Sequence, residues 1–89
     1  MNSIINFIEL ENRVISATYR NLMVGATVVL VHKTSGLELS DPVVRIASRV
    51  PVGSLRIRLP ASFKGGTYFL RARNVHGIHV AESAQFEVP

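Results

Sequence analysis

The chain has 89 residues, which is enough for one domain spanning residues 1–89 and too few for a second core. It contains no cysteine, which excludes disulfide cross-links, thiolate metal sites and a cysteine nucleophile. Hydrophobic residues make up 47% and charged residues 18%, below the roughly 25% charged residues of an average domain, so part of the surface is expected to be apolar or covered.

Positive charge is concentrated in the second half of the chain. Residues 1–44 contain three basic and four acidic residues, a balance of −1, whereas residues 45–89 contain seven basic and two acidic residues, a balance of +5. Eight of the ten basic residues are arginine, whose planar guanidinium pairs with a carboxylate or phosphate through two hydrogen bonds. This distribution predicts contact with an anionic partner.

The opening residues, 1–8, are rich in apolar side chains but fit no export or membrane signal. They lack a basic segment, and Asn6 and Glu9 interrupt the apolar run, so neither a signal peptide nor a membrane span is expected. Because it begins with Met, the chain is expected to be a complete small protein, with an excised domain as the alternative. Residues 4–8 are apolar on both faces of a predicted edge strand, so they are expected either to be buried in a sheet or to pair with another chain.

Seven strands are predicted, and no segment has the 3.6-residue period of an amphipathic helix. The strands alternate apolar and polar residues or are rich in β-branched residues, and turn-forming residues separate most of them. The fourth and fifth are expected to pair as a hairpin across residues 51–53, and the last is expected to be irregular near residues 81–84. The predicted strands are residues 4–10, 13–20, 27–32, 43–50, 54–59, 67–74 and 78–88.

The sixth predicted strand has the clearest alternation. Its even-numbered residues from Tyr68 to Ala72 should face the core, and its odd-numbered residues from Thr67 to Arg73 should face away from it. The pattern in this and the other strands predicts a core formed by Leu30, Ile46, Leu55, Ile57, Leu59, Tyr68, Leu70, Ala72 and Phe86.

A longer motif covers residues 53–88. It reads Gly53-Ser54-Leu55-x-Ile57-x-Leu59-Pro60, then Gly66-Thr67-Tyr68-x-Leu70-Arg71-Ala72-x-Asn74, and finally Ser83-x-x-Phe86-x-Val88. This arrangement resembles the closing half of immunoglobulin-like early-set modules and of fungal cell-wall-assembly sandwiches, and more loosely that of fibronectin type III domains.

The resemblance implies an all-β fold, a seven-stranded antiparallel immunoglobulin-like β-sandwich. It places Tyr68 at a tyrosine corner, with the phenol hydroxyl bonded to an upstream backbone group. The tryptophan and paired cysteines of antibody domains are missing, so the chain is not expected to be an antibody-type domain. No row of aromatic residues suited to contact with a sugar is evident.

The sequence predicts no catalytic site and no cofactor. The one aspartate, Asp41, precedes a proline in a predicted turn, and neither a Gly-x-Ser-x-Gly elbow nor an HExxH pair is present, so the protein is expected not to be an enzyme. His32, His76 and His79 could together offer three imidazoles to zinc. They lie on separate predicted elements with only Glu82 near in sequence, so metal binding is not expected.

Two arginine-containing groups are the candidate partner-binding sites. If the fourth and fifth strands form a hairpin, Arg49 lies opposite Arg56, and like charges opposed across a strand pair repel unless an anionic surface neutralises them. The hairpin would place Arg45, Arg49, Arg56 and Arg58 on one outer sheet face. A second patch on the other sheet would contain Phe69, Arg71 and Arg73, a composition typical of protein–protein hot spots.

Each group also has a simpler interpretation. The four-arginine face can be a solvated surface with Glu9 or Glu11 nearby, since surface charges commonly contribute nothing measurable. Phe69 can be covered by a neighbouring strand or by the N-terminal segment. Specific nucleic-acid binding is disfavoured because the arginine face lacks interleaved aromatic residues and the chain has only two lysines.

These observations predict a non-enzymatic structural or assembly module that docks onto other protein subunits with acidic surfaces and forms part of an oligomeric assembly. Phage virions use immunoglobulin-like domains in this way, so fold-level analogy suggests a virion decoration or accessory protein. The alternative is a carbohydrate- or surface-binding adhesion module. A binder of acidic polymers is a third hypothesis, and no membrane partner is expected.

Overall fold

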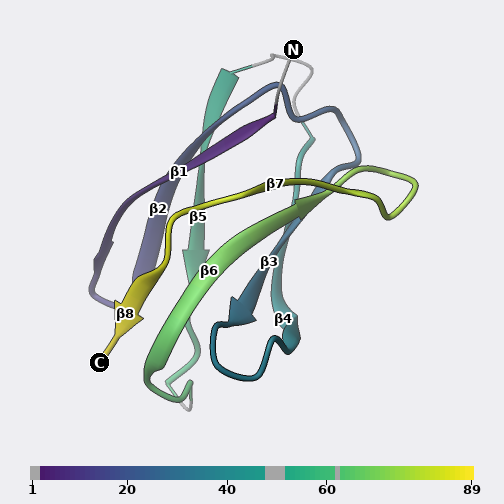
Figure 1. The fold of residues 1–89 in the computed structure, drawn as a ribbon. Coiled ribbons are helices and arrows are strands. Elements are labelled where there is room, and N and C mark those ends of the chain that lie inside the picture. Colours follow the sequence, from purple (N-terminus) through teal and green to yellow (C-terminus); the bar gives the residue numbers. More distant parts are fainter. Residues whose placement is uncertain (1–2, 48–51, 62) are drawn as a thin grey trace.

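The protein is built from antiparallel β-strands. The computed structural model describes residues 3–47, 52–61 and 63–89, with only the backbone described at residues 40–43 (Figure 1). This part of the chain contains no helix, and therefore none long and apolar enough to cross a membrane. The strands are β1 (Ile4–Glu11), β2 (Val14–Arg20), β3 (Thr27–His32), β4 (Glu38–Arg45), β5 (Val52–Arg58), β6 (Gly66–Arg73), β7 (His79–Glu82) and β8 (Phe86–Val88). The predicted all-β class is confirmed.

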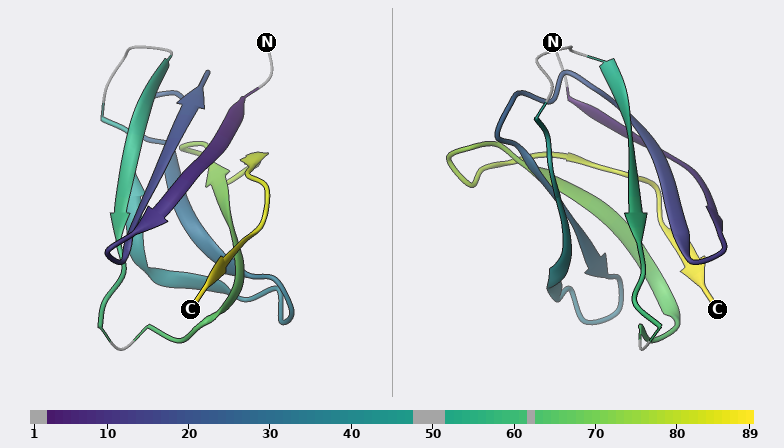
Figure 2. Two further views of the ribbon diagram at one scale, coloured as in Figure 1. Left: turned by 90° about the vertical axis from the view of Figure 1, so that its left-hand side faces the viewer. Right: turned by 180° about the vertical axis from the view of Figure 1, so that it is seen from behind.

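The strands form two sheets. One has three strands in the order β1-β2-β5, and the other has the order β4-β3-β6-β7, with β8 also paired to β6. All of the described pairs are antiparallel. Figure 2 shows the β1-β2-β5 sheet and the sheet around β3 and β6 as separate layers, an arrangement compatible with a β-sandwich.

A single apolar cluster connects the two sheets. It contains Ile15 and Ile57 from the three-stranded sheet and Val28 and Leu70 from the five-stranded sheet, all of them fully or almost fully buried. Alternation along each strand produces this arrangement, because every second side chain faces the other sheet. Each of the nine predicted core residues is buried: Leu30, Ile46, Leu55, Ile57, Leu59, Tyr68, Leu70, Ala72 and Phe86.

Tyr68 closes the corner that precedes β6. Its hydroxyl donates a hydrogen bond of 3.0 Å to the carbonyl oxygen of Lys64, and only 5% of the residue is exposed. The ring of Phe63 lies 4.9 Å from the Tyr68 ring and that of His32 lies 5.1 Å from it, centroid to centroid. The predicted bond from the phenol to an upstream backbone group is therefore confirmed.

The fourth strand differs from the prediction. β4 begins at Glu38, five residues before the predicted start, and it pairs with β3 rather than with β5. The short β3–β4 turn explains this pairing, since it is closed by hydrogen bonds from His32 N to Leu37 O and from Gly36 N to His32 O. Meanwhile β5 pairs with β2 along seven consecutive positions. The predicted hairpin between the fourth and fifth strands is wrong.

The Asp41-Pro42 pair is the physical reason for this error. Such a pair usually marks a turn, but here it lies inside β4, at the edge of the five-stranded sheet. Pairing passes from Val29–Val43 to Val31–Glu38, so the register shift leaves residues 39–42 outside the regular ladder. Proline is tolerated at such a position because no ladder hydrogen bond requires its missing N–H.

The final predicted strand, residues 78–88, is divided into β7 and β8. Ser83 causes the interruption: its backbone N–H donates to Leu70 O at 2.8 Å, and its hydroxyl accepts a hydrogen bond of 2.9 Å from Leu70 N. A side chain thus replaces a backbone partner at this point. The irregularity predicted near residues 81–84 is found at residues 83–85, and the described chain has eight strands rather than seven.

Candidate docking surfaces

Two loops at one end of the molecule together expose an apolar surface. They are the β2–β3 connection, residues 21–26, and the β6–β7 turn, residues 74–78, both at the upper right of Figure 1. The loops meet, because the Cβ atom of Val75 lies 3.6 Å from where a Cβ on Gly25 would be. The loop-end surface consists of Met23, Val24, Val75 and Ile78, which are 74%, 46%, 70% and 60% exposed.

Hydrogen bonds fix the backbone of the β6–β7 turn. The Asn74 side-chain oxygen accepts from His76 N at 2.9 Å and from Ile78 N at 3.0 Å. Backbone bonds of 2.9 Å also join Asn74 N to Ile78 O and Gly77 N to Asn74 O. The turn thus holds Val75 and Ile78 in place without burying them.

The β2–β3 connection is fixed in a similar way. Ala26 N donates to Met23 O at 3.0 Å, and Gly25 N donates to Ile46 O at 2.9 Å, which ties the loop to the end of β4. Leu22 and Ala26 are buried and anchor its two ends. A loop that is already ordered loses less conformational entropy when it binds.

Arginines border the loop-end surface, and its two loops contain no acidic residue. Arg20 ends β2 and Arg45 ends β4, and both are exposed. Arg45 and Arg73 both lie in register with Thr27, the first residue of β3, so the ends of these strands lie together. Apolar side chains are thus exposed on the two loops, and exposed arginines lie at the ends of the adjoining strands.

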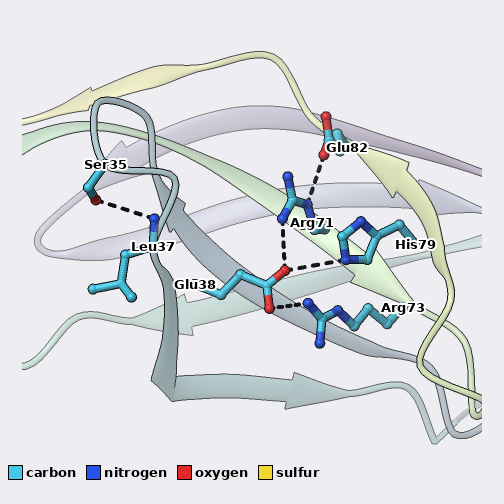
Figure 3. Close-up of polar contacts among 7 residues, drawn as sticks. All are labelled: Ser35, Leu37, Glu38, Arg71, Arg73, His79 and Glu82. Atoms are coloured by element: carbon cyan, nitrogen blue, oxygen red, sulfur yellow. Dashed lines mark hydrogen bonds and ion pairs between the residues drawn. The ribbon is translucent and has the colours of Figure 1, made fainter.

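The outer face of the five-stranded sheet carries an ion-pair network centred on Glu38 (Figure 3). Arg71 donates from Nη1 to Glu38 Oε2 and from Nε to Glu82 Oε2, each at 2.8 Å. Arg73 pairs with Glu38 Oε1, and His79 Nε2 lies 3.5 Å from Glu38 Oε2. The hydrogen bond from Arg71 is the main cause that lowers the pKa of the Glu38 carboxyl, against the opposing effect of burial.

This network changes the interpretation of the patch predicted at Phe69, Arg71 and Arg73. The structure brings the three to one face of β6, as expected, but the two arginines already pair with carboxylates of the same chain. Phe69 is half-buried, and the Arg71 guanidinium lies 5.4 Å from its ring centroid. A depression of about 260 Å³ beside the ring is lined by Lys33, Phe69, Glu82, Ser83 and Gln85. A partner role for this patch stays a prediction.

The predicted four-arginine face does not form as expected. Because β4 pairs with β3, Arg45 lies on the five-stranded sheet, whereas Arg56 and Arg58 lie on β5 in the three-stranded sheet. Arg49 lies outside the described residues. A partner role for each of these arginines stays a prediction, but the geometry that grouped them on one hairpin is wrong.

Arg56 and Arg58 instead share a face with two carboxylates. Strand register places Glu9, Ser16 and Arg56 in one row across β1, β2 and β5, and it places Glu11, Val14 and Arg58 in the next. A depression of about 310 Å³ over these rows is lined by Glu9, Glu11, Asn12, Val14, Ser16 and Arg56. Within the described chain, no ion pair joins the acids of β1 to the arginines of β5.

The three histidines are dispersed. His32 contacts Ser35 through Nδ1 at 2.9 Å, His79 lies beside Glu38, and His76 is in the exposed β6–β7 turn. Over residues 3–47, 52–61 and 63–89, no group of three or more His, Asp or Glu side chains is arranged to hold a metal ion.

Sequence reasoning missed two features of these surfaces. The first is the loop-end surface, whose signal was available: Met23, Val24, Val75 and Ile78 lie beside Gly25 and Gly77, in connections where polar turn residues are usual. The second is the role of Glu38, which depends on the position of β4 and had no local signal.

The comparisons with known proteins found no match: no protein-family model, no curated protein and no solved structure matches this chain.

Proposed function

We propose that the protein is a non-enzymatic structural module that docks onto another protein subunit through the loop-end surface. One observation carries this proposal: four apolar side chains are exposed together on two loops whose backbones are held by hydrogen bonds. Exposed apolar side chains that gather in one patch favour a partner over water. Ordered loops lower the entropic cost of binding that partner.

The arginines beside the loop-end surface indicate the charge expected on the partner. An apolar centre with a polar margin is the usual anatomy of a protein–protein interface, and the margin here is formed by the exposed Arg20 and Arg45. The complementary surface is an apolar socket with carboxylates around it. Such carboxylates would speed association and set its orientation more than they would add affinity. Arg71 and Arg73 are less suited to this role because Glu38 and Glu82 already neutralise them.

The strand order supports an immunoglobulin-like sandwich as part of the proposal. In constant-type immunoglobulin domains the fourth strand joins the sheet of the first, second and fifth strands. Here β4 joins the sheet of β3 and β6, so the chain is closer to the looser relatives of that fold. Sandwiches of this kind commonly bind through the loops at one end. A virion accessory subunit is the setting that we propose by analogy of fold.

The carbohydrate-binding alternative has less support. Residues 21–26 and 74–78 contain no phenylalanine, tyrosine or tryptophan, the side chains on which sugar rings usually stack. Among the described aromatics, Tyr19, Tyr68 and Phe86 are buried in the core. The residues of these two loops therefore do not favour a sugar.

A random peptide library displayed on phage tests the proposal. We expect the immobilised protein to enrich peptides that combine apolar residues with aspartate or glutamate, and NMR shift mapping to place them on residues 21–26 and 74–78. Val75→Ser and Ile78→Ser should each weaken binding of an enriched peptide by about tenfold. Leu37→Ser is the matched control, because Leu37 is 61% exposed but lies in the β3–β4 turn at the other end of β3.

Two outcomes would overturn this proposal. In the first, no acidic apolar peptide is enriched, or the enriched peptides bind equally well to the Val75→Ser and Ile78→Ser variants. In the second, the wild-type protein sediments with phosphatidylserine vesicles while ignoring the peptides, which would assign the basic apolar end to a lipid surface instead.

A further inference from the structure

The outer face of the three-stranded sheet is divided by charge and polarity. In β2 and β5 every second residue lies on this face. In β1 the register shift between Phe7 and Glu9 adds one residue, so Ile4, Asn6, Glu9 and Glu11 lie on it. Register arranges them in four rows across the sheet, which are Ile4–Arg20–Val52, Asn6–Thr18–Ser54, Glu9–Ser16–Arg56 and Glu11–Val14–Arg58. We refer to this as the striped face.

The two edges of the striped face complement each other row by row. In the last two rows the β1 edge carries a carboxylate and the β5 edge carries a guanidinium. In the first row both edges are apolar, with Ile4 42% and Val52 51% exposed. The middle strand carries mostly small side chains, so another surface can approach closely along β2.

This pattern fits a second copy of the same chain. A two-fold axis parallel to β2 and lying over it keeps every row in register and places β1 of one copy over β5 of the other. Glu9 then faces the partner's Arg56, and Glu11 faces the partner's Arg58. In the same arrangement Ile4 faces the partner's Val52. Interfaces about a two-fold axis need this kind of self-complementarity, in which each contact occurs twice.

The other way of stacking two striped faces lacks this match. A two-fold axis perpendicular to the strands places β1 over β1 and reverses the order of the rows. The carboxylates then meet Ile4 and Asn6, and the arginines meet Val52 and Ser54. The charges select the axis parallel to β2.

We propose that the striped face binds a second copy of the chain about a two-fold axis parallel to β2. The interaction is weak. Three strands about 4.8 Å apart and seven residues of about 3.3 Å each give a face of roughly 330 Å². This is well below the roughly 800 Å² that each partner buries in an interface of standard size. The dimer should therefore exchange quickly, depend on concentration and weaken as salt is raised.

The first row of the striped face contains one contact that is unfavourable in the dimer. Arg20 lies at the middle of the first row and faces its own copy across the axis, where like charges repel. It is the last residue of β2, so its side chain can turn towards solvent at the end of the sheet. The proposal depends on strand register and charge and shares only Arg20 with the margin of the loop-end surface. Variants at Glu9, Glu11, Arg56 and Arg58 therefore test it without altering the two loops.

Charge exchange between two variants tests the dimer. Variant one carries Glu9→Arg and Glu11→Arg, and variant two carries Arg56→Glu and Arg58→Glu. Each should bind itself about tenfold more weakly than the wild type at low salt, as measured by sedimentation velocity over a concentration series. Mixed in equal amounts, they should form a heterodimer at least as tight as the wild-type dimer. Every facing pair in the two rows again joins opposite charges, and because one copy then carries only arginines and the other only carboxylates there, the diagonal pairs between the copies are attractive as well.

A matched control distinguishes an effect of the charges on the striped face from an effect of net charge alone. Lys33→Glu with Lys64→Glu changes the net charge by the same amount as variant two but alters residues outside the striped face. This control should self-associate like the wild type and should pair with variant one far more weakly than variant two does. The proposal is overturned if the wild type stays monomeric at every concentration, if the two variants fail to pair, or if the control pairs with variant one equally well.

Discussion

The ring of Tyr19 covers Gly53 on the neighbouring strand. These two residues are paired across β2 and β5, and a Cβ atom on Gly53 would lie 2.5 Å from the Tyr19 hydroxyl oxygen and 2.7 Å from Cζ. Tyr19 is buried, so its ring has little room to move. Glycine at this position lets the phenol lie across the backbone of β5.

Gly53→Ala should therefore destabilise the protein. We expect a loss of about 1–3 kcal/mol in the free energy of unfolding, because the added methyl group must displace a packed ring. Urea denaturation followed by circular dichroism measures this value. Ser54→Ala on the adjacent exposed residue is the control and should change stability little. Equal stability of the alanine variant and the wild type would show that the Tyr19 ring is free to move.

Tyr68→Phe should cost about 1 kcal/mol or more. The substitution keeps the buried ring but leaves the Lys64 carbonyl without the hydroxyl that donates to it. Tyr19→Phe is a suitable comparison, because the Tyr19 ring is equally buried but its hydroxyl makes no hydrogen bond within the described residues. If thermal denaturation shows the same loss for both variants, the tyrosine corner adds nothing to stability.

Replacing Arg13 by glycine should reduce the free energy of unfolding less than replacing it by alanine. It has a φ of 61° in the β1–β2 turn, and its guanidinium donates to Pro60 O at 2.6 Å. Both substitutions remove that hydrogen bond, but glycine adopts positive φ without the Cβ penalty. We expect Arg13→Gly to be about 1 kcal/mol more stable than Arg13→Ala. The opposite order in urea denaturation would contradict this account of the turn.

Acid should weaken the network around Glu38. The pKa of Glu38 is lowered in the folded protein, so its contribution to stability is complete above the ordinary pKa of 4.5 and is lost as the pH falls through the lower folded value. Glu38→Gln should reduce stability at neutral pH by about 1 kcal/mol. It should also lose less further stability between neutral pH and acid than the wild type does. The exposed Glu11→Gln is the control, and a wild-type acid response in Glu38→Gln would be inconsistent with this role.

Local alternation was enough to predict the core, and the resemblance to immunoglobulin-like modules predicted the hydrogen bond of Tyr68. In β6, the even residues from Tyr68 to Ala72 are buried because period-two alternation is a property of the strand itself. The sequence-based prediction was wrong where the position of a residue depended on which strands pair with each other. The sequence pattern predicts the start of β4 five residues late because Asp41-Pro42 is typical of a turn, and this error puts Arg45 on the wrong sheet. The Glu38 network joins residues 33 and 35 positions apart, so it could not be predicted without the sheet order.

The interruptions in the five-stranded sheet bear on aggregation. One edge carries Pro42 within β4, and the other is broken between β7 and β8, so neither presents a continuous row of backbone donors and acceptors to another chain. In the three-stranded sheet, the register of β1 shifts beside the exposed Ile8, and β5 carries Arg56 and Arg58. These interruptions thus oppose growth into fibrils by strand addition in a chain that has 47% hydrophobic residues and no disulfide.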